Sequence, residues 1–238
     1  LNAVDTLVQW QLSSAPQVLP PYAEALLRRE LELFPEWYIG AHRQVTIDPA
    51  MRKTLDDTFA LLIQNNLSWP SVYVHRDFMP RNLMVPDDLA VPGQTDPHYL
   101  GVLDFQDAVY GPITYDIASL MRDAFLTWEE DFCLDVTIRY WEKARKAGLP
   151  VGDDFGEFYR GVEWMGLQRH LKIAGIFARL TLHDGKPKYL ADTPRFIDYI
   201  RSTCSRYIQL KPLLRLGAKV DGIEVPNVVA FGRSSPQT

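Results

Sequence analysis

The amino-acid sequence predicts a mostly helical α+β protein with a small sheet at its centre. Long stretches with apolar residues three and four positions apart lie on both sides of one β-rich region, and this spacing is typical of amphipathic helices. The β-rich region holds three short runs of β-branched and apolar residues between residues 71 and 103. Because functional polar groups sit best on loops held by a scaffold, we expect the chemistry on the loops of this sheet.

The predicted elements place helices before and after the sheet. Asp48 and Pro49 mark a helix start, because aspartate caps an N-terminus and proline fits the first helical position. Helices are predicted over residues 1–12, 21–34, 49–66, 114–124, 129–147, 155–182 and 194–210. Strands are predicted over residues 71–74, 82–85 and 99–103, with a loop over residues 86–98. Gly111 and Pro112 indicate a turn.

Composition and charge exclude several classes of protein. The net charge is -5, from 25 Lys and Arg against 30 Asp and Glu, so no basic surplus is present to bind nucleic acid. No run approaches the roughly 20 apolar residues that a membrane helix needs. Cys133 and Cys204 are far apart and are interpreted as ordinary thiols in a reducing compartment. We therefore expect a cytoplasmic protein with no membrane and no nucleic-acid partner.

Two polar segments follow predicted strands and carry the candidate chemistry. In the first, a strand delivers His-Arg-Asp into a loop, and Asn82 follows Asp77 after four residues. In the second, a strand ends in the carboxylates Asp104 and Asp107. We expect these four side chains to converge at the ends of adjacent strands.

This set of residues suits phosphoryl transfer. Divalent metal must neutralise the charge on the phosphate oxygens, and Mg²⁺ takes one or two carboxylates together with phosphate oxygens and water. Asp104 and the side-chain oxygen of Asn82 fit that requirement. Asp77 must stay off the metal and accept or orient the proton of the attacking hydroxyl. Aspartates near Gly and Pro often serve only as turn or cap residues, but two strand-end carboxylates with a spaced Asn favour the catalytic interpretation.

The first segment resembles the catalytic loop of protein kinases and of the aminoglycoside phosphotransferase and choline kinase families. Asp104 lies where the second metal-binding aspartate of these families falls. The run from Gly111 to Leu120 looks like their Gly-x-x-x-x-Asp-x-Ala element, with its aspartate at Asp116. The phosphotransferases usually carry His-Gly-Asp, whereas this sequence has His-Arg-Asp at residues 75–77.

A closer resemblance is to the bacterial anomeric sugar kinases of cell-wall recycling, which phosphorylate N-acetylmuramate and N-acetylglucosamine at the C1 hydroxyl. The segments that carry this resemblance are residues 75–85, 101–112 and 166–180. The resemblance implies a protein-kinase-like C-terminal lobe over residues 1–220, with residues 221–238 as a tail. It also implies ATP as co-substrate and Mg²⁺ as cofactor.

The resemblance assigns a role to each candidate residue. It implies Asp77 as catalytic base, with Asn82 and Asp104 as magnesium ligands. Asp107 is either a further ligand through water or a cap of the loop. Asp116 is expected to hydrogen-bond the backbone of the catalytic loop and keep it in shape, and His75 is expected to brace the same loop through hydrogen bonds.

The nucleotide-gripping lobe of kinases has no counterpart in this sequence. No Gly-x-Gly-x-x-Gly, no Gly-x4-Gly-Lys-Ser/Thr and no Val-Ala-Ile-Lys-like strand precedes His75. The resemblance therefore covers the second lobe only, and we expect the first lobe to be absent from this chain. Whether the chain is active alone stays open.

Substrate contacts are expected from the helices. Glu163, Gly166 and His170 form a polar stripe at spacings of three and four on a mainly apolar helix. The stripe either lines a sugar pocket or forms hydrogen bonds in the interior, so Glu163 and His170 are kept as substrate candidates. Three arginines, Arg122, Arg169 and Arg179, are candidates for a substrate carboxylate, because a guanidinium matches that geometry. Arg122 is the best placed of them, just after the helix start at Asp116.

The predicted function is ATP-dependent phosphorylation of the anomeric hydroxyl of an amino sugar, giving the sugar 1-phosphate. Its partners are a small-molecule sugar and ATP. Two alternatives stay open. One is an aminoglycoside or choline-type phosphotransferase, whose cationic substrates need an acidic pocket. The other is a non-catalytic kinase-like binding module.

Overall fold

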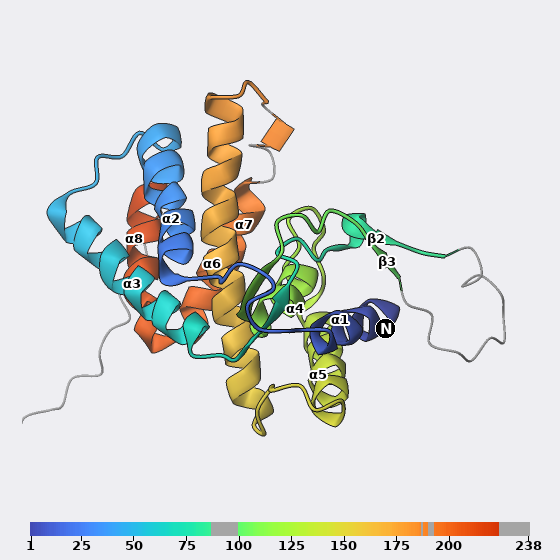
Figure 1. Ribbon diagram of the computed structural model, residues 1–238. Coiled ribbons are helices and arrows are strands. Elements are labelled where there is room, and N and C mark those ends of the chain that lie inside the picture. Colours follow the sequence, from blue (N-terminus) through green and yellow to red (C-terminus); the bar gives the residue numbers. More distant parts are fainter. Residues whose placement is uncertain (87–99, 187, 190–192, 224–238) are drawn as a thin grey trace, which may run out of the picture.

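Helix α6 (Phe155–Leu182) is the central element of the structure, a computed structural model that describes residues 1–86, 100–186, 188–189 and 193–223. It runs through the middle of the molecule, with α2, α3 and α8 on one side and α1, α4 and α5 on the other (Figure 1). The bounds of the other helices are α1 Asn2–Leu12, α2 Glu24–Leu33, α3 Pro49–Leu67, α4 Thr114–Met121, α5 Glu130–Lys146, α7 Thr193–Arg206 and α8 Lys211–Asp221. The mostly helical α+β prediction is confirmed.

The sequence analysis did not predict the π-helix that follows α2 or the last helix, α8. A π-helix, Phe34–His42, continues directly from α2 and packs on α6. The predicted helix 194–210 ends at Arg206, and after a 3-10 turn at Ile208–Leu210 the chain forms α8. Pro212 lies in the first turn of α8, where its missing N–H costs nothing.

The end of α8 corrects the predicted start of the tail. Asp221 accepts a hydrogen bond from the Tyr38 hydroxyl at 2.8 Å and pairs with Arg201 at 2.6 Å. It is therefore part of the folded body. Of the predicted tail, residues 224–238 lie outside the described part of the chain, as does most of the predicted loop at residues 86–98.

The strands form two small antiparallel sheets. Strand β1 (Ser71–Val74) pairs with β4 (Val109–Pro112), and β2 (Leu83–Met84) pairs with β3 (Gly101–Val102). Strands were predicted at the positions of β1, β2 and β3, but the last two are shorter than expected.

The predicted turn at Gly111 and Pro112 is wrong, because both residues belong to β4. Tyr110, next to them in β4, makes two backbone hydrogen bonds to the neighbouring segment: its carbonyl accepts from the Tyr22 N–H at 2.8 Å, and its N–H donates to the carbonyl of Pro20 at 2.8 Å. A Cβ atom at Gly111 would lie 2.7 Å from the Cβ of Tyr22, so the glycine permits this close approach. Pro112 ends the strand, where a missing donor is tolerated.

The core lies between α6 and the elements around it. The predicted apolar face of α6 is fully buried and consists of Trp164, Leu167, Leu171, Ala174 and Ala178. Both cysteines are buried free thiols. Within the described ranges, no helix combines the length and hydropathy that crossing a bilayer requires.

The cap of α3 gives a first test of the fold. The Asp48 carboxylate accepts the Met51 N–H at 2.8 Å, so the predicted cap is confirmed. We expect Asp48→Ala to lower the free energy of unfolding by about 1 kcal/mol, measured by urea denaturation. Asp57→Ala on the same helix removes an exposed carboxylate that caps nothing and should change stability by less than about 0.5 kcal/mol. Equal effects of the two substitutions would contradict the capping role.

Candidate active site

The catalytic loop leaves β1 and reaches β2 through a short 3-10 turn at Pro80–Asn82. The Asn82 side-chain amide donates to the carbonyl oxygen of Asp77 at 2.9 Å. The Leu103 N–H donates to the carbonyl of Asn82 at 2.9 Å. These bonds fix the two loop residues to each other and to the strand that leads to Asp104.

His75 joins the two polar segments through its ring. Its Nε2 lies 2.9 Å from the carbonyl oxygen of Leu103, and its Nδ1 accepts the Asp77 N–H at 3.3 Å. A ring that donates from Nε2 and accepts at Nδ1 is neutral. Burial also lowers the pKa of His75 and so favours the neutral form.

Asp116, on α4, binds the backbone of the loop between β1 and β2. Its carboxylate accepts the N–H groups of His75 at 2.7 Å and Arg76 at 3.1 Å. Burial raises its pKa to about 7, against these hydrogen bonds and the nearby Arg169. Arg76 has a φ of 76°, a left-handed conformation that is uncommon outside glycine. The two hydrogen bonds stabilise this strained turn.

A cleft of about 500 Å³ brings the predicted catalytic residues together. Its lining comes from the catalytic loop, the Asp104 loop, the segment after α4 and one face of α6: Asp77, Met79, Arg81, Asn82, Asp104, Ala124, Phe125, Arg169, Lys172, Ile173, Ile176 and Phe177. Asp107 is exposed and lies outside this lining. A second cleft of about 750 Å³ shares Arg81 and Phe125 with the first and extends to Tyr189.

The chemistry of Asn82 and Asp104 fits a magnesium ion. The Asn82 amide nitrogen is engaged with Asp77, so the side-chain oxygen is left to act as a ligand. The backbone of Asp104 is left-handed, with a φ of 66°. Its Oδ1 accepts a hydrogen bond from the side-chain amide of Gln106 at 2.6 Å, and the carboxylate keeps further lone pairs for a metal ion. Over the described ranges, no three His, Cys, Asp or Glu side chains cluster in a way that would hold a metal. One carboxylate with an amide oxygen is the sparse donor set that Mg²⁺ uses beside phosphate.

A buried ionic cluster around Glu30 lies behind the catalytic loop. Glu30 Oε1 accepts from Arg76 at 2.6 Å and from Lys172 at 2.8 Å, while Oε2 accepts from Gln168 at 3.0 Å and from the Tyr22 hydroxyl. The sequence analysis assigned no role to Glu30 or Lys172. Nothing in the local sequence pattern separates Glu30 from the other acidic residues near it, such as the exposed Glu24 and Glu36.

The charge of Glu30 makes stability dependent on acid pH. Burial alone would raise the pKa of Glu30, but Lys172, Tyr22 and Arg76 together lower it to about 2. A carboxylate with a lowered pKa stabilises the fold above its unfolded pKa, and this contribution disappears as the pH falls toward 2. We therefore expect Glu30→Gln to cost about 3 kcal/mol at pH 7 and much less near pH 2.5, measured by urea unfolding across this range. Glu36→Gln, at an exposed site in the π-helix, is the matched control. A cost for Glu30→Gln that does not change with pH would contradict the assignment.

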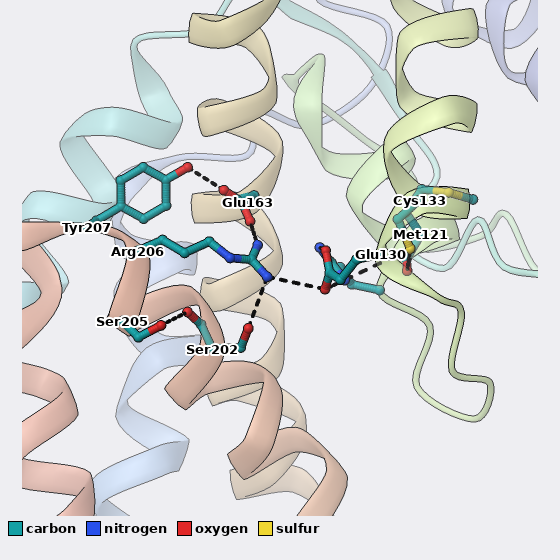
Figure 2. Close-up of polar contacts among 9 residues, drawn as sticks. Met121, Glu130, Cys133, Glu163, Ser202, Ser205, Arg206 and Tyr207 are labelled. Atoms are coloured by element: carbon teal, nitrogen blue, oxygen red, sulfur yellow. Dashed lines mark hydrogen bonds and ion pairs between the residues drawn. The ribbon is translucent and has the colours of Figure 1, made fainter. Parts of the chain in front are cut away.

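Of the substrate candidates from the sequence, Arg169 lines the cleft around Asp77, whereas Glu163, His170 and Arg122 do not. Glu163 on α6 is buried and pairs with Arg206 and Tyr207, and Arg206 also reaches Glu130 at 3.3 Å (Figure 2). Arg122 makes two hydrogen bonds to Glu130, at 2.7 and 2.9 Å. These contacts join α5, α6 and α7. In this structure Glu163 and Arg122 therefore hold helices together.

His170 is also separate from the cleft. It is buried, its ring stacks on Tyr199 with 4.7 Å between centroids, and neither ring nitrogen has a hydrogen-bond partner among the described residues. Burial and the nearby charges of Arg122 and Arg169 place its pKa well below the usual value. His170 is therefore a neutral interior residue in this structure.

Comparison with known proteins assigns the chain to a family. The phosphotransferase enzyme family matches residues 2–155, and the chain belongs to this family. Over 224 residues it is 50% identical to an N-acetylmuramate/N-acetylglucosamine kinase of Neisseria meningitidis, covering 94% of this chain and 64% of that protein. A protein of the same name from Pseudomonas putida is 47% identical over 219 residues, covering 92% of this chain and 62% of that protein.

A solved structure agrees with this fold. An aminoglycoside phosphotransferase crystallised with ADP superposes with a TM-score of 0.50 at 13% identity, covering 84% of this chain and 62% of that one. At this identity the likeness concerns the fold alone. The chain spans less than two thirds of the length of the curated relatives it matches.

Proposed function

We propose that this chain is the catalytic and acceptor-binding part of an ATP-dependent amino-sugar kinase. It would phosphorylate the anomeric hydroxyl of N-acetylmuramate or N-acetylglucosamine, in the cytoplasm, as a step of cell-wall recycling. The observation that carries the proposal is the convergence of Asp77, Asn82 and Asp104 on one cleft. The two relatives with N-acetylmuramate/N-acetylglucosamine kinase in their names support the substrate class.

The residues of the cleft divide the chemistry between them. Asp77 accepts or orients the proton of the attacking hydroxyl, from a loop that His75 and Asp116 hold in place. Asn82 and Asp104 would hold Mg²⁺, which neutralises charge on the phosphate oxygens when bound. A loop fixed by hydrogen bonds before the reaction lowers the barrier, because its groups need no reorganisation.

The wall of the cleft formed by α6 argues against a cationic acceptor. Arg169 and Lys172 face the same cleft as Asp77, so an aminoglycoside or choline would meet positive charge there. Like charges at close range disfavour binding. The proposal therefore favours a neutral or anionic sugar over the substrates of the alternative phosphotransferases.

The test is phosphate transfer from ATP with Mg²⁺, measured with residues 1–238 and with the full-length gene product. The acceptors are N-acetylmuramate, N-acetylglucosamine, an aminoglycoside and choline. We expect transfer to an N-acetyl sugar. Transfer only to the aminoglycoside or to choline would overturn the acceptor class. Sugar binding without transfer by either form would favour the non-catalytic binding module.

A further inference from the structure

The cleft has an acidic wall and a basic wall. The catalytic loop and the Asp104 loop supply Asp77 and Asp104, whereas α6 supplies Arg169 and Lys172. The two basic residues are three positions apart, so they lie on the same face of the helix. An acceptor that fills this cleft meets carboxylates at one side and cations at the other.

Lys172 is only partly neutralised by the protein. Its ammonium group bonds to Glu30 Oε1 at 2.8 Å, and the same oxygen accepts from Arg76 at 2.6 Å. Glu30 is the carboxylate partner of Lys172 among the described residues, and one carboxylate oxygen therefore serves two cations. A lysine ammonium has three donors, and in the described part of the chain Glu30 engages one of those of Lys172, which leaves donors for a ligand.

The surroundings of Lys172 strengthen its attraction for an anion. The side chain is 15% exposed, and the neighbouring residues of the same wall, Ile173, Ile176 and Phe177, are apolar. Charged hydrogen bonds are stronger in such a water-poor setting than at an open surface. Arg169 differs in role: it is almost fully buried, and its guanidinium donates to the carbonyl of Arg76 at 2.6 Å.

We propose that Lys172, with Arg169 behind it, binds a carboxylate of the acceptor and selects N-acetylmuramate over N-acetylglucosamine. The two sugars differ by the lactyl ether, which carries the carboxylate. Lys172 is thus a specificity-determining residue and takes no part in proton transfer. This inference rests on the proposed sugar-kinase function and adds the group that recognises the charged substrate.

Lys172 would bind an anionic oxygen, and both the carboxylate of the sugar and the phosphates of ATP carry such oxygens. Binding of four probes separates these sources: N-acetylmuramate, its uncharged methyl ester, N-acetylglucosamine and ATP with Mg²⁺. Titration calorimetry with the full-length protein measures each affinity without relying on turnover. Phosphate transfer to N-acetylglucosamine by the wild type tests the proposed function separately.

For the wild type we expect N-acetylmuramate to bind about 10- to 100-fold more tightly than its methyl ester, the range of one charged hydrogen bond. Lys172→Met should remove this difference and leave N-acetylglucosamine and ATP unchanged, and Lys172→Arg should restore most of it. Lys53→Met, at an exposed site on α3, is the control for loss of a lysine.

Three outcomes would overturn the inference. The first is equal affinity of the wild type for the acid and the ester. The second is an equal loss of affinity for all three sugars in Lys172→Met. The third is a loss of affinity in that variant confined to ATP, which would assign Lys172 to a phosphate. Because the acid and ester comparison needs no variant, equal affinities overturn the inference even if Lys172→Met fails to fold. In that case Lys172→Arg, which keeps the charge, tests the assignment to residue 172 through a changed preference for the acid. Charge-dependent binding without phosphate transfer would leave the inference standing and overturn the proposed function alone.

Discussion

Replacing Asp77 with asparagine is expected to lower kcat for phosphate transfer by about 10³-fold, in the range that a positioned general base contributes. Asparagine keeps the size of the side chain but cannot accept the proton. The backbone bonds of Asp77 to His75 and Asn82 do not involve its carboxylate, so the free energy of unfolding should change by less than about 1 kcal/mol. Single-turnover assays and urea unfolding of the same preparation measure both quantities.

A matched substitution and a metal titration sharpen this test. Asp153→Asn changes an exposed aspartate that pairs with Arg145, and it should leave kcat unchanged. Asp104→Asn should raise the Mg²⁺ concentration needed for half-maximal activity, whereas Asp77→Asn should not. A fall of less than 10-fold in kcat for Asp77→Asn would remove Asp77 from the role of base.

The proximity of the proposed catalytic residues could be predicted from sequence because their geometry is largely local. Asp77 and Asn82 lie within one loop, and a single hydrogen bond between them fixes their separation. Asp104 follows β3, which pairs with β2 directly after Asn82. Two short strands therefore suffice to bring all three residues to one cleft, and strand patterns are readable in the sequence.

The burial of Glu30 against Lys172 could not be predicted, because it depends on long-range packing. Glu30 meets Lys172 and Gln168, partners that are 142 and 138 residues away in the chain. Helical periodicity indicates which face of a helix is apolar, but it does not identify the helix that covers that face. A charged residue buried by such packing has the same local sequence as an exposed one, which is why the sequence assigned no role to Glu30.

The same limit explains the false turn at Gly111 and the substrate candidates on α6. Turn chemistry predicts a reversal at Gly-Pro, yet pairing with β1 and contact with Tyr22 keep the chain extended there. Glu163 and His170 follow a correct helical stripe, but α7 covers that stripe with Arg206 and Tyr199. In both cases the outcome depends on tertiary contacts between distant segments, and the sequence of one segment does not reveal such contacts.

Gly175 marks the closest approach of α6 to the junction of α2 and the π-helix. A Cβ atom at this position would lie within 3.0 Å of the carbonyl oxygen of Leu33, closer than Cβ atoms in proteins come to other atoms. The obstacle is backbone, so a side-chain rotation cannot relieve the clash. Since the π-helix packs extensively on α6, both elements would have to move apart.

We therefore expect Gly175→Ala to lower the free energy of unfolding by about 3 kcal/mol, at the upper end of the cost of overpacking a core. Gly217→Ala on α8 is the matched control, because a Cβ atom there meets nothing within 4 Å. Alanine has the higher helix propensity, so this control should stabilise the protein by about 0.5 to 1 kcal/mol. Urea denaturation of the two variants should thus give shifts of opposite sign. Stabilisation by Gly175→Ala would show that α6 is not in close backbone contact with Leu33 at the end of α2.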